Sequence, residues 1–366
     1  MVNKQVAIVG GGLAGLYAAR LLHKAGIEFV LYEARERVGG RILTIDATGA
    51  PALDGFDLGP SWFWPEAQPA IGAVVDELGL AAFRQASAGD VVFERMSREA
   101  PQRYQSRFVE PPSMRLVGGT AALVQALLRD LPAEKILRGY RVSELKLCEN
   151  GIDLTIADHN DVSRVHKACA VIAAMPPRLL EATVTFDPPQ DAEIRKLWRE
   201  TPTWMAPSAK FIAIYDQPFW HAAGLSGTAQ SLVGPLAEIH DASTASGQSA
   251  LFGFLGISAD QRANHGNEPL TRACLAQLAR IYGPMALAPR ATPYKDWAAD
   301  SLTATALDRV SAGHVVPRTA PWVLGSWADR LTLGGSETSP SEPGYLAGAI
   351  AAAERAVAAT LINIRV

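Results

Sequence analysis

Three glycines near the start of the chain have the spacing of a phosphate-binding turn. Gly10, Gly12 and Gly15 follow the apolar run 5–9 and precede an amphipathic run that ends near Lys24. A backbone that approaches a pyrophosphate closely has no room for side chains, and the N–H groups of a helix N-terminus attract the phosphates. A purely structural turn between a strand and a helix could carry the same glycines, so the pattern needs its context.

A carboxylate further along the chain supplies that context. The apolar run 27–32 predicts a second strand, which ends at Glu33, about 20 residues after the glycines. In dinucleotide-binding folds a carboxylate at this place accepts hydrogen bonds from the ribose hydroxyls. We therefore predict a βαβ unit that binds a dinucleotide, with Leu13 and Ala14 in the same phosphate-binding turn.

The residues after Glu33 distinguish between dinucleotides. Glu33-Ala34-Arg35 is followed by Gly40 and Arg41, so a second close backbone and a guanidinium are available to the diphosphate. A nicotinamide enzyme has no obvious need for these groups. Together with the glycine turn, the stretch resembles the flavin-containing amine oxidase family. The resemblance implies bound FAD, with Glu33 on the adenosine ribose and Arg41 on the pyrophosphate.

A second motif of this family lies near the end of the chain. Gly335-Ser336-Glu337 is followed by Gly344, Tyr345 and Leu346 at the start of a predicted helix. The resemblance implies that this helix N-terminus faces the pyrimidine edge of the flavin and stabilises the reduced anion. Glu337 would bind the ribityl or diphosphate part. Tyr345 would be the surviving wall of an aromatic substrate cage, or else a tyrosine in the seam between domains.

Weaker family-like segments lie between the two motifs. The resemblance implies further cofactor contacts from Gly59, Pro60, Ser61, Trp62, Val142, Met175 and Trp297. Among these, Val142 would meet the adenine edge and Trp62 would also face the substrate cavity. Pro60 lacks an N–H, so no hydrogen bond to the flavin is expected from its backbone nitrogen.

Lys210 is the candidate catalytic residue in the middle of the chain. It lies in the apolar run 209–215, where a lysine is commonly an end-of-strand residue whose ammonium reaches solvent. In the family, the corresponding lysine holds a water near flavin N5, and a buried ammonium there would stabilise superoxide forming from dioxygen. Phe252 or Phe254 of a later strand would line the substrate cavity with Trp62.

The run 303–307 departs from the family pattern. Monoamine oxidases carry an aromatic residue after the tryptophan that corresponds to Trp297, in some cases preceded by a cysteine that bonds the flavin. Here the run is Thr-Ala-Thr-Ala-Leu. We therefore expect non-covalent FAD and a cage that lacks one wall. The short segment 66–117 predicts a small lid over the substrate.

Two interleaved domains would position these residues. The predicted fold class is α/β: a Rossmann-type FAD-binding domain interleaved with an α+β substrate domain. The FAD-binding domain would comprise 1–65, 118–187 and 310–366, and the substrate domain 66–117 and 188–309. Within them the sequence predicts helices over 69–80, 121–131 and 270–282, and a hairpin over 144–165 that turns at Asn150-Gly151. It also predicts strands at 169–175, 251–256 and 330–338.

Composition restricts the possible partners. The net charge of −3 and the pI of about 6.2 indicate no surface for nucleic acid or anionic membranes. We expect no membrane span and no signal peptide, because the alanine-rich tail is interrupted by Glu354-Arg355 and the glycine turn begins at Gly10. The three cysteines lack metal-ligand spacing, so we predict reduced thiols in the cytoplasm and no metal.

The leading functional hypothesis is oxidation of an amine. Hydride would pass from the carbon of a CH–NH group to flavin N5, and dioxygen would reoxidise the flavin. A second hypothesis uses the same cofactor as a desaturase, dehydrogenase or isomerase at a CH–CH bond of an apolar molecule, with another electron acceptor. A third is a flavin-binding protein without catalysis. The sequence predicts a small-molecule substrate and specifies no oligomeric state.

Overall fold

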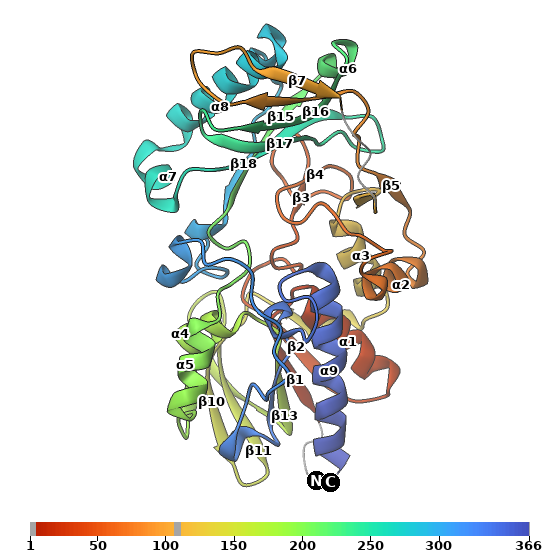
Figure 1. Ribbon diagram of the computed structural model, residues 1–366. Coiled ribbons are helices and arrows are strands. Elements are labelled where there is room, and N and C mark those ends of the chain that lie inside the picture. The colour runs from red at the N-terminus through yellow and green to blue at the C-terminus, as the bar shows by residue number, and fades with distance from the viewer. Residues whose placement is uncertain (1–4, 106–110, 366) are drawn as a thin grey trace.

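A parallel sheet of five strands forms the centre of the lower lobe in Figure 1. The computed structural model describes residues 5–105 and 111–365. The strand order is β20-β13-β1-β2-β9, with bounds Leu331–Leu333, Ala170–Ala173, Val6–Val9, Phe29–Glu33 and Ile136–Arg138. All residues of β1 are at most 6% exposed because both faces of the sheet are covered. The glycine turn therefore leaves the central strand at the carboxyl edge of the sheet, where α/β folds bind ligands.

Helices cover one face of this sheet. α1 (Leu13–Lys24) and α9 (Leu346–Arg365) pack against each other, α3 (Ala121–Arg129) lies next to α1, and α2 (Pro69–Glu77) lies next to α9. Their apolar side chains share one core with β1 and β13. The predicted helices over 69–80 and 121–131 are confirmed, and each ends a few residues earlier than predicted.

A four-stranded sheet covers the opposite face. Its order is β12-β11-β10-β14, with bounds Ser163–Ala168, Gly151–Ala157, Arg141–Cys148 and Thr185–Asp187. β10 and β11 form the predicted hairpin. α4 (Pro177–Thr183) and α5 (Ala192–Glu200) pack against each other beside it. Trp198 of α5 is buried in the same core as β13, so α5 packs with the lower lobe although it lies in the segment predicted for the substrate domain.

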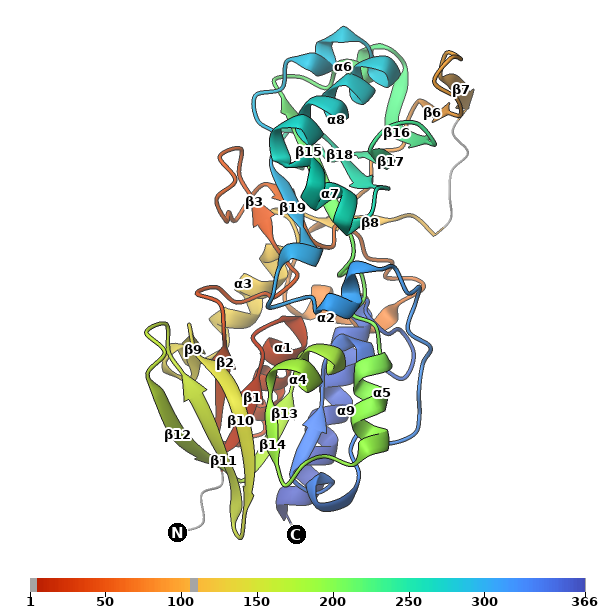
Figure 2. The same cartoon turned by 90° about the vertical axis from the view of Figure 1, so that its left-hand side faces the viewer.

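The upper lobe is built on a seven-stranded sheet (Figure 1). The order is β19-β15-β18-β17-β16-β6-β7, with bounds Tyr294–Asp296, Ala209–Tyr215, Ser249–Leu255, Leu236–Asp241, Leu225–Ser231, Asp90–Glu94 and Gln102–Gln105. Figure 2 shows α8 (Asn267–Tyr282) beside this sheet, together with α7 (Ala259–His265) and α6 (Phe219–Ala222). Phe211 and Leu251 point toward α8, whereas Ile212 and Phe252 belong to a separate core on the other face.

Short elements connect the two lobes. Two small antiparallel pairs join β3 (Thr44–Ile45) with β4 (Phe56–Asp57) and β5 (Ala82–Arg84) with β8 (Met114–Leu116). Single 3₁₀ turns occupy Ala133–Lys135, Pro284–Leu287, Trp297–Ala299, Ala306–Arg309, Gly325–Trp327 and Ser336–Thr338. Chain segments cross between the lobes several times, which is the interleaving that the sequence predicts; the exact domain boundaries stay a prediction.

By length and composition alone, one described helix could cross a membrane. It is α9, over Leu346–Ile364, and half of its most apolar stretch is buried inside the protein. The buried side includes Ala353, Ala356 and Val357, which pack in the core shared with α1. The apolar character of α9 is explained by its packing in the core of the Rossmann lobe.

Candidate functional site

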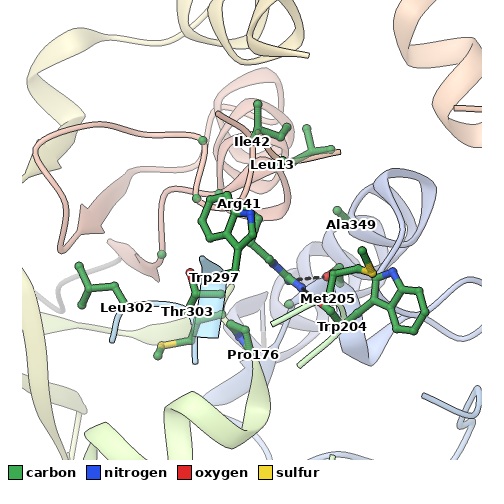
Figure 3. A pocket seen from close by; sticks show the side chains of 18 of the residues that line it. Leu13, Arg41, Ile42, Pro176, Trp204, Met205, Trp297, Leu302, Thr303 and Ala349 are labelled. Atoms are coloured by element: carbon green, nitrogen blue, oxygen red, sulfur yellow. Dashed lines mark hydrogen bonds between the residues drawn. The ribbon is translucent and has the colours of Figure 1, made fainter. Parts of the chain in front are cut away.

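A cavity of about 600 Å³ lies between the lobes and joins the N-terminal and C-terminal motifs. Figure 3 shows part of its lining, with Arg41, Trp204 and Trp297 projecting from different segments. The predicted residues that line the cavity are Gly10, Gly12, Leu13, Ala14, Glu33, Ala34, Arg35, Gly40, Arg41, Gly59, Pro60, Ser61, Trp62, Val142, Met175, Lys210, Phe254, Trp297, Gly335, Ser336, Gly344, Tyr345 and Leu346. Gly15, Phe252 and Glu337 are absent from this lining.

The N-terminus of α1 opens into the cavity. Gly12 is its N-cap residue, and no side chain caps the helix. A Cβ placed on Gly12 would meet no atom within 4 Å. Free helix N–H groups beside an open space fit the diphosphate of a dinucleotide.

Gly15 lies where α1 packs on the glycine turn. A Cβ at Gly15 would lie 1.9 Å from the carbonyl oxygen of Gly10. The residue therefore allows α1 to pack directly on the turn that follows β1, and it does not reach the cavity. Gly15 shapes the turn through helix packing, and its direct contact with the cofactor stays a prediction.

Glu33 ends β2 at the wall of the cavity with both carboxylate oxygens held. Oε2 accepts a hydrogen bond from the Gly11 N–H at 2.7 Å, and Oε1 accepts one from the Arg35 N–H at 2.8 Å. The Arg35 guanidinium is held in turn by Asp300 and Thr303. A carboxylate oxygen has further lone pairs, so Glu33 is fixed in place and can still accept from ribose hydroxyls.

Arg41 and Glu337 form an ion pair that links the two terminal motifs. The Arg41 Nη1 lies 2.6 Å from Glu337 Oε1, and Glu337 is fully buried. Arg41 also donates to the Trp204 carbonyl at 2.9 Å and to the Ser336 hydroxyl at 3.0 Å. Glu337 does not line the cavity, and its carboxylate orients the Arg41 guanidinium; a direct contact of Glu337 with the cofactor stays a prediction.

The part of the cavity where the sequence predicts the adenine is apolar. Val142 lies on β10 and is 5% exposed, and Met175 follows β13. Both line the cavity together with Pro176, Leu302 and Thr303, three contributors that the sequence did not suggest. Figure 3 shows the last three on the same side of the cavity as Trp297.

Lys210 is buried at the opposite end. Its side chain is only 2% exposed, which excludes the alternative of an end-of-strand lysine that reaches solvent. Nζ donates to the carbonyl oxygens of Asp57 and Gly59, at 2.9 and 2.8 Å, and to the Ser61 hydroxyl at 2.8 Å. Burial lowers the pKa of the Lys210 ammonium to about 7. The ammonium therefore holds the segment 57–61 against β15, close to the predicted flavin contacts.

Aromatic side chains surround this ammonium. Its Nζ lies 4.2 Å from the centroid of the Phe252 ring and 5.3 Å from that of Phe254. Phe254 lines the cavity, but Phe252 lies beneath it, packed against Trp62. The Trp62 indole is fixed by a hydrogen bond from Nε1 to Gln85. Of the two phenylalanines left open by the sequence, Phe254 is the one that reaches the cavity.

Tyr345 belongs to an aromatic group that the sequence did not reveal. Its ring lies 5.4 Å from the His314 ring at an interplanar angle of 17°, and 6.3 Å from Trp64. His314 in turn stacks on Trp204 at 3.5 Å. Trp64 could have been suspected because it follows Trp62 in the same run, whereas no periodicity or motif marks Trp204 or His314.

A carboxylate that no motif indicated also lines the substrate end. Glu238 lies on β17, and its Oε1 is 2.6 Å from His240 Nε2. The hydrogen bond from His240 lowers the pKa of Glu238, so its carboxylate is ionised. Only the pairing of β17 with β18 brings this residue to the cavity, and such pairing is not evident from a single strand.

Comparison with known proteins agrees with this geometry. Residues 87–361 match the family model for flavin containing amine oxidoreductase, and residues 8–78 match that for an NAD(P)-binding Rossmann-like domain. The Dictyostelium discoideum protein named "Probable flavin-containing monoamine oxidase A" is 23% identical, over 94% of each chain.

Two solved structures have the same fold. Cyclohexylamine oxidase from Brevibacterium oxydans superposes with a TM-score of 0.81 at 19% identity over the whole of both chains. Putrescine oxidase bound to putrescine superposes with a TM-score of 0.78 at 21% identity, over 98% of this chain and 99% of that one.

Fold and site together define an FAD-dependent oxidoreductase. The uncapped helix, the fixed carboxylate of Glu33 and the Arg41 guanidinium lie around one cavity and suit a flavin dinucleotide. The family model spans most of the sequence. The chain belongs to the flavin containing amine oxidoreductase family.

Proposed function

We propose that this protein oxidises a small amine at a CH–NH bond, with non-covalent FAD and with dioxygen as the final electron acceptor. The observation that carries the proposal is the continuity of the cavity. It runs from the phosphate-binding end of α1 to the buried Lys210 and the aromatic wall. Relatives named as amine oxidases support the choice of an amine over a CH–CH bond.

The cofactor would be held along the full length of the cavity. Glu33 would accept from its ribose, the N-terminus of α1 would bind its diphosphate, and Arg41 would add a positive charge. The N-terminal end of α9 would face its pyrimidine edge. Bound FAD supplies the hydride acceptor, which no side chain can provide.

The protein's own residues would orient the amine and control its charge. Below its pKa of about 7, the Lys210 ammonium disfavours a second positive charge nearby, so an amine bound beside it is stabilised in the neutral form that hydride transfer requires. Trp62, Phe254 and Tyr345 line the cavity and would exclude water around the reacting carbon. The same ammonium would favour negative charge that develops on dioxygen.

A non-covalent cofactor is proposed from the positions of the thiols. Cys148 is exposed, and Cys169 and Cys274 are buried in the protein. None of these residues lines the cavity. Denaturation of the yellow protein should therefore release FAD into the supernatant after precipitation; flavin that stays with the precipitate would contradict this part of the proposal.

The activity is tested without oxygen. The FAD-loaded protein is mixed anaerobically with a panel of alkylamines, arylalkylamines and diamines, and the absorbance of oxidised flavin is followed. We expect at least one amine to bleach the flavin, and air to restore it with release of hydrogen peroxide. Rapid reoxidation by a quinone but not by air would favour the CH–CH alternative. A flavin that no amine reduces would contradict the proposal.

A further inference from the structure

An ion pair joins the two lobes beside the nucleotide end of the cavity. Arg35 follows β2 of the lower sheet, and Asp300 lies in the segment after β19 of the upper sheet. The Arg35 Nη2 lies 2.7 Å from Asp300 Oδ1, although 265 positions separate the two residues in the sequence. Arg35 lines the cavity, whereas Asp300 does not. Asp300 can therefore act on a ligand in the cavity only through the guanidinium that it holds.

The Asp300 carboxylate is fixed in its own segment. Its Oδ2 accepts a hydrogen bond from the Lys295 ammonium at 2.7 Å, and its side chain is only 13% exposed. The Asp300 backbone carbonyl accepts from the N–H groups of Thr303 and Ala304, at 2.9 and 2.8 Å. The carboxylate thus stands on a turn that its own hydrogen bonds hold in place, and little water competes for its charge-assisted bonds.

Thr303 completes the support of the guanidinium. It lines the cavity (Figure 3), and its Oγ1 accepts from the same Arg35 Nη2 at 2.8 Å. Both N–H groups of Nη2 are thus directed at protein oxygens. Within the ranges 5–105 and 111–365, the Arg35 Nε and Nη1 donate no hydrogen bond. The guanidinium is held by one nitrogen, and the N–H groups of the other two are available to a ligand.

These available N–H groups lie beside the predicted ribose site. The Arg35 Nη1 is 3.8 Å from Glu33 Oε1. A carboxylate that ends the second strand of a βαβ unit accepts from the ribose hydroxyls of an adenosine. A guanidinium next to it can donate to the sugar or stack on the base, because its planar group does both. Arg35 is therefore placed to contact the adenosine half of a dinucleotide.

We propose that Asp300 is a positioning residue for the adenosine half of FAD: it holds the Arg35 guanidinium beside the ribose site, with help from Thr303. The proposal rests on the function proposed above, because it requires FAD as the cofactor. A free arginine side chain loses rotamer freedom when it orders on a ligand. Since Asp300 orders Arg35 before the cofactor arrives, it strengthens binding without touching the cofactor.

The test measures cofactor binding and not turnover. FAD-free protein is titrated with FAD, followed by flavin fluorescence, and with ADP, which carries the adenosine half alone, followed by calorimetry. Asp300→Asn keeps the size of the side chain and removes its charge. It should raise the Kd of both ligands by about tenfold, the value of a charge-assisted hydrogen bond. Thr303→Val removes only a hydroxyl acceptor and should raise both Kd values by about threefold.

A double-mutant cycle tests whether Asp300 acts through Arg35. Arg35→Met should weaken FAD and ADP at least as much as Asp300→Asn does, and the combined variant should show no further loss. A residue that only supports the cavity wall would give additive losses. Glu28→Gln is the matched control, because it breaks an exposed ion pair with Lys135 just before β2, at the other end of the strand. It should leave both Kd values unchanged.

The outcomes separate the two proposals. Unchanged Kd values in Asp300→Asn, or losses that add to those of Arg35→Met, would overturn the positioning role of Asp300 while FAD binding stands. Denaturant unfolding of each FAD-free variant checks that it is folded. If Asp300→Asn does not fold, Thr303→Val alone and combined with Arg35→Met decides the same point. If the native protein does not bind FAD, the proposed function fails and the positioning role fails with it.

Discussion

The two ends of the cavity are built in different ways. The phosphate-binding part of the nucleotide end is formed by glycines, backbone N–H groups and a helix N-terminus, all within one βαβ unit. The substrate end is formed by side chains such as Lys210, Phe254 and Glu238, which three strands of the upper sheet bring together. The first end depends on close backbone packing, and the second depends on charge and side-chain shape. Substitutions at the two ends should therefore change different properties.

The largest expected effect is on the packing of the nucleotide end. Gly15→Ala should destabilise the protein by about 3 kcal/mol and reduce its FAD content, because the added methyl group would meet the Gly10 carbonyl oxygen at 1.9 Å. Chemical denaturation and the flavin content after purification measure both effects. Gly12→Ala is the matched control, since its methyl group meets no protein atom within 4 Å. It should weaken FAD binding with little loss of stability; equal stability losses would contradict this distinction.

The next effect concerns the link between the terminal motifs. Glu337→Gln should cost about 2 kcal/mol, because it leaves the partly buried Arg41 without its anionic partner. FAD affinity should also fall, since the guanidinium loses its orientation. Titration of the FAD-free protein with FAD measures the affinity, and unfolding by denaturant measures the loss of stability. An unchanged affinity would show that Glu337 does not position Arg41 for the cofactor.

At the substrate end, the buried Lys210 should make the free energy of unfolding depend on pH. Its pKa of about 7 lies below the ordinary value of 10.5, so between these values the unfolded chain binds more protons than the folded one. The free energy of unfolding should therefore gain up to about 1.4 kcal/mol per pH unit from this group as pH rises above 7. Unfolding of the native protein and of Lys210→Met at several pH values isolates the contribution. If the free energy of unfolding changed with pH equally in the two proteins, Lys210 would not be a buried group whose pKa is lowered by folding.

The smallest effect is expected for the hydroxyl of Tyr345. Tyr345→Phe keeps the ring beside His314 and Trp64, and it removes only a long contact of 3.3 Å to His314. We expect kcat/KM for amines to change by less than about threefold, within the range of a weak, exposed hydrogen bond. Steady-state oxidation measures it. A tenfold loss would assign the phenol a direct role in the reaction.

The sequence predicted most of the nucleotide end because its signals are local. The glycine spacing, the strand that ends at Glu33 and the C-terminal Gly-Tyr run each lie within one short segment. A motif shows which residues matter, however, and not which neighbour each touches. The packing of Gly15 against Gly10 and of Glu337 against Arg41 appears only in three dimensions.

The substrate end was less predictable because it depends on long-range pairing. Lys210 was found through its family-like strand, but whether it is buried or reaches solvent was decided by the carbonyl oxygens of the segment 57–61. Glu238 sits in an ordinary strand with no motif, and strand register alone aligns it with Phe254. His314 comes from an irregular segment that no periodicity describes.

The most direct test of the central claim is the anaerobic spectrum of the purified protein with an added amine. A single cavity that holds FAD along its length and an amine beside Lys210 predicts a yellow protein whose flavin absorbance disappears on amine addition and returns in air. A protein that remains colourless with excess FAD would contradict the cofactor site. A yellow protein that no amine bleaches would contradict the chemistry assigned to the substrate end.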